Sequence, residues 1–142
     1  MKKNAGKRIT VWLGALQIFI GIGAIPAGIV LICDSSGGGL WMSTEMLKNS
    51  PFSNFLIPGI FLFLVNGLGS LLGGVASLLR YKFFAKIAVG LGVFLVAWIL
   101  IQIWWVGVHW LHLMYGCLGI IELVLGVVAK GLNGDKNYIL RK

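Results

Sequence analysis

The residue with the clearest chemical potential in this sequence is Glu122, the only charged residue between Leu113 and Ala129. A carboxylate in a long apolar segment is costly unless a cation pairs with it. The apolar segments contain no lysine or arginine, so we expect the protonated acid. Two interpretations stay open: the acid shares a hydrogen bond with Gln17 and holds helices together, or it is a proton-coupling or cation-binding site, as intramembrane acids often are.

Three amide side chains, Gln17, Asn66 and Gln102, lie in the other apolar segments. At a helical rise of about 1.5 Å per residue, Gln17 and Glu122 both lie roughly 12–13 Å from the basic residues that flank their segments. Asn66 and Gln102 lie about 21–24 Å from theirs, which predicts a second polar level nearer the opposite surface. We expect all four side chains to turn toward the protein interior and to form a candidate polar site.

His109 and His112 are three residues apart on one helical face, a spacing that could hold a metal ion or haem. The third ligand could come only from Asp34 or Glu45, so an outer-edge site of His109, His112 and Asp34 is the alternative to an interfacial role. The acids are scattered one per region, and no phosphate loop or cofactor fingerprint occurs. We therefore predict no catalytic residue, no metal and no cofactor.

Four apolar segments, at residues 9–32, 55–79, 87–107 and 110–129, must position these side chains. Hydrophobic residues make up 58% of the 142-residue chain and charged residues 11%, a balance that suits a bilayer rather than water. Each segment approaches the roughly 20 residues that cross a hydrocarbon core about 30 Å thick. The sequence predicts an all-α fold, a four-helix antiparallel transmembrane bundle that forms a single domain over residues 1–142.

The connection between the first two segments has a pattern of its own. A glycine-rich exit, DSSGGGL, is followed by LWMSTEMLK, which predicts a short interfacial segment in the first outer loop. We expect it to lay Leu40, Trp41 and Leu47 on the lipid headgroups. The alternative is that the loop forms a lid over an outward-facing cavity.

The basic residues predict the orientation of the bundle. Eleven of the twelve lysines and arginines lie at the two chain ends or in the connection at residues 80–86, all on one side of the predicted bundle. The positive-inside rule places that side, with both termini, in the cytoplasm of a multi-pass plasma (inner) membrane protein. The net charge of +8 then reflects topology and contact with anionic lipid, and no nucleic-acid partner is predicted.

Glycine is the main packing signal, with 21 glycines in the chain. In the second segment, Gly67, Ser70, Gly74 and Ser77 recur at spacings of three and four, which predicts a smooth helix face that allows close packing. Such faces could meet another helix of the same chain, a second copy in a homo-oligomer, or a partner membrane protein.

Two resemblances to known families are present. VNGLGSLLGG is similar to a stretch of the small four-helix fluoride channels, which would make Asn66 a pore residue. The third segment, however, lacks the threonine- and serine-rich break of those channels, which argues against this assignment. A broader stretch, with SPF and LIPG in the loop and YGCLGIIELVLG later, resembles an uncharacterised family of small four-helix bacterial integral membrane proteins. This resemblance implies the topology and a bacterial plasma membrane, but no activity.

These patterns predict a function class. We expect a non-catalytic accessory or hydrophobic-ligand-binding bundle in the lipid bilayer rather than an enzyme, because one acid and three amides are few for a pump. The alternative is a small proton- or ion-coupled transporter or channel that uses Glu122.

Overall fold

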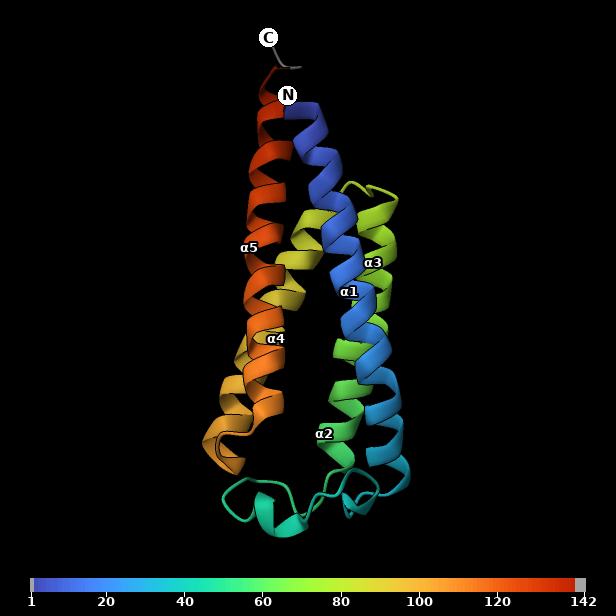
Figure 1. Ribbon diagram of the computed structural model, residues 1–142, viewed down its shortest axis with the longest axis vertical. Helices are drawn as coiled ribbons and strands as arrows, with labels where there is room; N and C mark the ends of the chain where they lie inside the picture. Colours follow the sequence, from blue (N-terminus) through green and yellow to red (C-terminus); the bar gives the residue numbers. More distant parts are fainter. Residues whose placement is uncertain (1, 140–142) are drawn as a thin grey trace.

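The chain forms an antiparallel bundle of long helices in the computed structural model, which describes the backbone of residues 2–139 and the side chains of residues 4–132 (Figure 1). The helices are α1 (Lys2–Cys33), α2 (Leu56–Phe61), η3 (Leu62–Gly69), α3 (Ser70–Leu78), α4 (Phe84–Val106) and α5 (Trp110–Ile139). Since α2, η3 and α3 follow one another as one rod, the bundle has four spanning units, each long and apolar enough to cross a membrane. The predicted all-α, four-helix class is confirmed.

The first and last helices are longer than predicted. α1 begins at Lys2 rather than residue 9, and α5 ends at Ile139 rather than residue 129, because the polar chain ends continue the helices past their apolar portions. Both ends lie on the same side of the bundle, beyond the turn between α3 and α4 (Figure 1). The predicted basic cluster on this side includes five residues that lie outside the described side chains: Lys2, Lys3, Lys136, Arg141 and Lys142.

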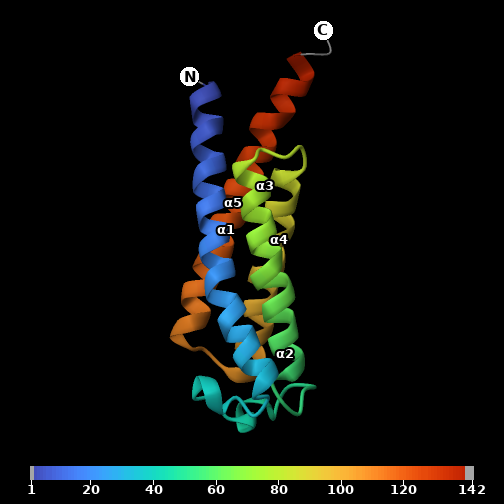
Figure 2. The same ribbon diagram turned by 90° about the vertical axis from the view of Figure 1, so that its right-hand side faces the viewer.

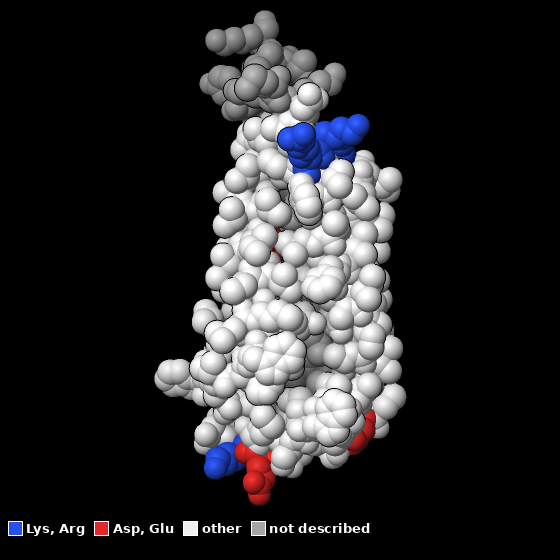
Figure 3. All heavy atoms as spheres, viewed as in Figure 1, with Lys and Arg blue, Asp and Glu red and all other residues white. Residues whose placement is uncertain are grey.

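The outside of the bundle is apolar over its middle. Large side chains such as Trp12, Leu72 and Trp104 are 70%, 71% and 85% exposed. Charged atoms lie near the two ends of the face seen in Figure 3, with an uncharged band between them. Such a surface is unfavourable in water and suits hydrocarbon, so the chain is a multi-pass membrane protein by its composition.

The bundle consists of two hairpins. In the first, α1 packs along α2, η3 and α3, and in the second, α4 packs along α5 (Figures 1 and 2). The two hairpins meet mainly through α1 against α5 and α3 against α4. At the end near the chain termini, a core of Leu13, Phe84, Ala85, Ala88 and Ala129 joins them. Small side chains in this core let the hairpins approach closely.

The predicted continuous helix over residues 55–79 is interrupted by η3, a π-helical segment. A π-helix has wider turns than an α-helix and is rare outside functional sites. Along this segment α1 lies very close: a Cβ on Gly28 would be 2.7 Å from the Cβ of Phe63, and one on Gly67 would be 2.7 Å from Ile25. Pro26 of α1 lies in the same stretch, where proline removes a backbone hydrogen bond and bends a helix.

The glycine-rich faces pack inside the chain. Beside the contacts of Gly28 and Gly67, Gly14 faces Leu78, Gly74 faces Ile18, and Gly92 faces Leu123 at distances that leave no room for a side chain. The partners of these faces in the structure are therefore other helices of the same chain.

The outer loop folds back over one end of the bundle. It contains two short 3-10 helices, η1 (Gly38–Leu40) and η2 (Thr44–Leu47). Leu47, only 4% exposed, packs with Leu31 and Phe55, so the expectation that it rests on headgroups is wrong. Trp41 does point outward, with 97% of its surface exposed. The loop thus covers this end of the bundle. Leu47 anchors it in the core, and Trp41 is exposed.

Close packing of α4 on α5 can be tested with two neighbouring glycines. A Cβ on Gly92 would lie 2.8 Å from the backbone nitrogen of Leu123, whereas one on Gly90 would meet nothing within 4 Å. Gly92→Ala should therefore destabilise the protein by about 1–3 kcal/mol. Gly90→Ala, the matched control, should be neutral or stabilising because alanine favours helix. Unfolding by dodecyl sulfate titration in mixed micelles measures both; equal effects would contradict this packing.

Candidate functional site

The predicted contact between Gln17 and Glu122 is present, and it belongs to a cluster that joins three helices. The Gln17 side-chain amide of α1 donates a hydrogen bond from Nε2 to Glu122 Oε1 of α5, at 2.9 Å. The Ser77 hydroxyl of α3 donates to Gln17 Oε1, at 2.7 Å. All three side chains are fully buried. Gln17 thus bridges an acid and a hydroxyl that belong to different hairpins.

Apolar layers enclose this inner polar cluster, which we define as Gln17, Ser77 and Glu122. On one side lies the core that contains Leu13, and on the other a core of Ile20, Leu95 and Ile99. Gly73 leaves space for the Gln17 amide, since a Cβ there would lie 3.0 Å from Nε2. Glu122 Oε2 has no hydrogen-bond partner in the described part of the chain. The cluster is therefore buried between apolar layers, as expected of polar contacts that hold helices together.

Ser77 was not predicted as a polar partner, although its position was noted. Its place in a stripe of small residues suggested helix packing alone. Ser77 precedes Arg80 by three residues, so the inner polar cluster lies close to the α3–α4 turn. Counting the depth of Gln17 from Arg8 hid this proximity, because α1 runs beyond that turn (Figure 1).

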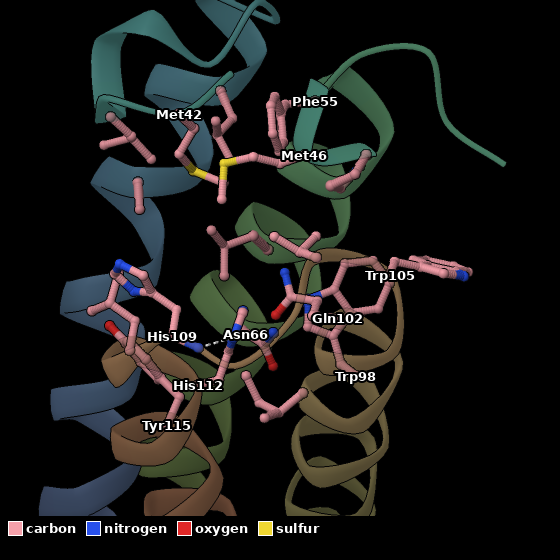
Figure 4. A pocket seen from close by; sticks show the side chains of 18 of the residues that line it. Met42, Met46, Phe55, Asn66, Trp98, Gln102, Trp105, His109, His112 and Tyr115 are labelled. Carbon is pink, nitrogen blue, oxygen red and sulfur yellow. Dashed lines mark hydrogen bonds between the residues drawn. The ribbon is translucent and has the colours of Figure 1, made fainter. Parts of the chain in front are cut away.

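A cavity of about 500 Å³ lies between the two hairpins at the loop end of the bundle. This volume falls within the range of roughly 300–1,000 Å³ that is usual for small-molecule sites. Figure 4 shows Met42, Met46 and Phe55 at its outer end, with Asn66, Trp98 and Gln102 deeper inside. Most of the lining is aliphatic, aromatic or thioether, and the residues that line the cavity include no Lys, Arg, Asp or Glu of the described chain.

The four predicted polar residues are divided between two places. Asn66 and Gln102 both line the cavity, whereas Gln17 and Glu122 do not. The two predicted levels are thus separate sites, with the core of Ile20, Leu95 and Ile99 at the boundary.

Aromatic side chains fix one wall of the cavity. Trp98 stacks on Phe94 with an interplanar angle of 8° and lies 5.4 Å, centroid to centroid, from Phe61. Nearer the loop, Phe52 meets Trp105 edge-on at 5.3 Å. These contacts hold α4 against the segment that leads into and through α2. The alternative of a lid over an outward-facing cavity anticipated a space beneath the loop. Its size and its aromatic wall were not predicted, because they depend on how far the hairpins separate.

The alternative site of His109, His112 and Asp34 at the outer edge is not assembled in the structure. His109 and His112 both line the cavity, and the His109 backbone N–H donates to His112 Nδ1 at 3.2 Å. Asp34 is not among the lining residues. Its carboxylate accepts hydrogen bonds from the Ser36 hydroxyl at 2.6 Å and from the Gly39 N–H at 3.0 Å. Within the described chain, no group of three or more His, Cys, Asp or Glu residues could hold a metal ion.

Comparison of the chain with protein-family models, with curated proteins and with solved structures finds no match. The resemblances noted from the sequence therefore stay predictions, and the function must be inferred from the two sites.

The inner polar cluster predicts a graded set of stability changes. Gln17→Leu leaves the Glu122 carboxyl and the Ser77 hydroxyl without their partner and should destabilise the bundle by about 1–3 kcal/mol. Ser77→Ala removes one hydrogen bond and should cost about 1 kcal/mol. Glu122→Gln keeps an acceptor for Gln17 and should change stability by less than about 0.5 kcal/mol. Titration with dodecyl sulfate ranks the three, and a Gln17→Leu protein as stable as the parent would contradict the assignment.

The hydrogen bonds of the Asp34 carboxylate should make the stability of the loop conformation depend on pH. The Ser36 hydroxyl, followed by the Gly39 N–H, holds the pKa of Asp34 below its usual value of 3.8. A depressed pKa means that these bonds stabilise the folded loop above pH 3.8 and are lost as the pH falls through the folded pKa. The Gly39 amide resonance should shift over this acid range and be pH-independent in Asp34→Asn. The Phe52 amide, which donates to the non-titrating Ser50 hydroxyl at 3.2 Å, serves as the internal control.

Proposed function

We propose that this chain is a non-catalytic membrane protein that binds a hydrophobic ligand in the cavity between its two hairpins. The observation that carries the proposal is the cavity itself: about 500 Å³ of space within a bundle whose other half is closely packed. A membrane bundle with no ligand to hold would gain packing energy by closing such a space.

The lining supports an apolar occupant. Met42 and Met46 enter from the outer loop, and methionine side chains adapt to ligands of varied shape. Leu62, Leu95 and Ile99 supply aliphatic walls, while the aromatic wall of Trp98 is rigid. The combination of a mostly apolar surface and a few polar groups is typical of small-molecule sites.

The distribution of basic residues supports an orientation with both termini in the cytoplasm of a plasma membrane. The cavity would then lie in the outer half of the bilayer, beneath the loop formed by η1 and η2. The bacterial plasma membrane implied by the sequence resemblance fits this arrangement.

A proton- or ion-coupled transporter is the second candidate, and one observation favours it: Glu122 Oε2 is buried without a partner in the described chain. The enclosing apolar layers weigh against it, since Glu122 does not line the cavity. A third possibility, an accessory protein that binds partners through its glycine faces, draws less support because those faces pack internally.

Replacement of two alanines by phenylalanine, one at a time, tests ligand binding. Ala27 of α1 lines the cavity, whereas Ala97 of α4 is exposed on the outside of the bundle. N-phenyl-1-naphthylamine, a neutral fluorescent probe, should bind detergent-solubilised protein and accept energy from its tryptophans. Ala27→Phe fills the cavity and should reduce the saturable signal at least tenfold. Ala97→Phe, the matched control, should leave it unchanged.

Two outcomes would reject the proposal. One is a signal that does not saturate in the parent protein, as expected for partition into micelles alone. The other is equal binding by the Ala27→Phe and Ala97→Phe proteins.

A further inference from the structure

Two buried hydrogen-bond donors in the cavity lack partners. Asn66 Nδ2 and Trp98 Nε1 make no hydrogen bond within the described chain, and their residues are only 2% and 8% exposed. Both residues line the cavity, and Figure 4 shows them together at its deeper end. An unsatisfied N–H is especially unfavourable at membrane depth, where water does not replace the missing acceptor. Both nitrogens are covered by neighbouring atoms in this structure, so an acceptor that enters the cavity bonds them only when these side chains turn toward it.

The residues that carry the two donors pack closely against their neighbours. The stack of Trp98 on Phe94 and its contact with Phe61 fix the indole ring. Asn66 lies in the π-helical segment η3, which α1 packs closely through Gly28 and Gly67. A ligand must therefore offset the cost of turning these side chains, which favours an acceptor that bonds both donors at once.

The chemistry of the donors limits what the ligand can be. An indole N–H only donates, and an amide NH₂ also donates, so the matching ligand atom must be an acceptor. No Lys, Arg, Asp or Glu of the described chain lines the cavity, so apart from His109 and His112 an ionised ligand would have no charge partner there. A neutral carbonyl oxygen, with two lone pairs, meets both conditions.

We propose that the cavity binds a neutral, carbonyl-bearing lipid, whose carbonyl oxygen accepts hydrogen bonds from Asn66 Nδ2 and Trp98 Nε1. Its apolar remainder lies against the methionine and phenylalanine side chains toward the loop. This inference rests on the proposed function and names the class of ligand. The ester carbonyl of a glycerolipid and the ring carbonyl of a quinone share this chemistry.

Competition by a matched pair of hydrocarbons tests the inference. Heptadecane and 2-heptadecanone have the same chain length and differ by one carbonyl group. Each displaces N-phenyl-1-naphthylamine from detergent-solubilised protein, and the ratio of their half-displacement concentrations is recorded. The ketone should act at about a five- to tenfold lower concentration than the alkane, because it satisfies donors that the alkane leaves bare.

Variants separate recognition from partitioning into micelles. In the parent the ketone should be about five- to tenfold more effective than the alkane. In Asn66→Leu and in Trp98→Phe this ratio should fall to about twofold or less. Trp104→Phe is the matched control, since Trp104 is 85% exposed and does not line the cavity; it should keep the full preference. Asn66→Leu should unfold at the same or a higher temperature without ligand, because it removes an unpaired amide. A lower unfolding temperature would indicate a structural role for Asn66 and overturn its assignment to the ligand.

The outcomes distinguish this inference from the proposed function. Saturable probe binding with equal displacement by ketone and alkane would overturn the carbonyl assignment and leave the hydrophobic site standing. Absence of saturable probe binding would reject both. Once the ketone preference is established, dioctanoylglycerol and decylubiquinone identify the source: the stronger competitor in the parent protein should lose its advantage in Asn66→Leu.

Discussion

The constraint that governs this structure is the inability of hydrocarbon to accept or donate hydrogen bonds, so each polar side chain within the bundle needs a partner inside it. Gln17 meets this requirement for two neighbours at once, because its amide donates to Glu122 and accepts from Ser77. The amide of Asn66 and the indole N–H of Trp98 do not meet it within the described chain. By the same rule the cavity is an incomplete site with two unpaired donors, and the inner polar cluster keeps one unpaired oxygen, Glu122 Oε2, in the described chain.

The space for that incomplete site follows from how side-chain size varies along the helices. Near the chain termini, Leu13 of the first hairpin packs into one core with Ala85, Ala88 and Ala129 of the second, and these small side chains let the hairpins lie close together. Toward the loop the facing residues are larger: tryptophan, phenylalanine and methionine line the space between the hairpins. Bulky side chains hold the hairpins apart there, and the loop anchored by Leu47 covers the resulting cavity.

The number, order and antiparallel arrangement of the spanning helices could be predicted from the sequence, because the lengths of the apolar segments and of their connections report them directly. The contact of Gln17 with Glu122 could also be predicted, since depth restricts which polar groups can meet. Ser77 could not, because the level of one helix relative to another depends on where each leaves the membrane. The π-helical turn around Asn66 and the wall formed by Trp98 were equally hidden, as both arise from packing between hairpins. Leu47 was misplaced for the same reason: hydrophobicity alone does not distinguish a lipid-facing side chain from one that folds inward.

The position of the cavity has a consequence for how an occupant would arrive. Its outer end is lined by loop side chains, and the face seen in Figure 3 is hollowed in its lower half, on the side of the bundle. Entry from the side would mean exchange with neighbouring lipids rather than with aqueous solution. Occupancy would then follow the mole fraction of the molecule in the leaflet, so a species too insoluble to be measured in water could still saturate the protein.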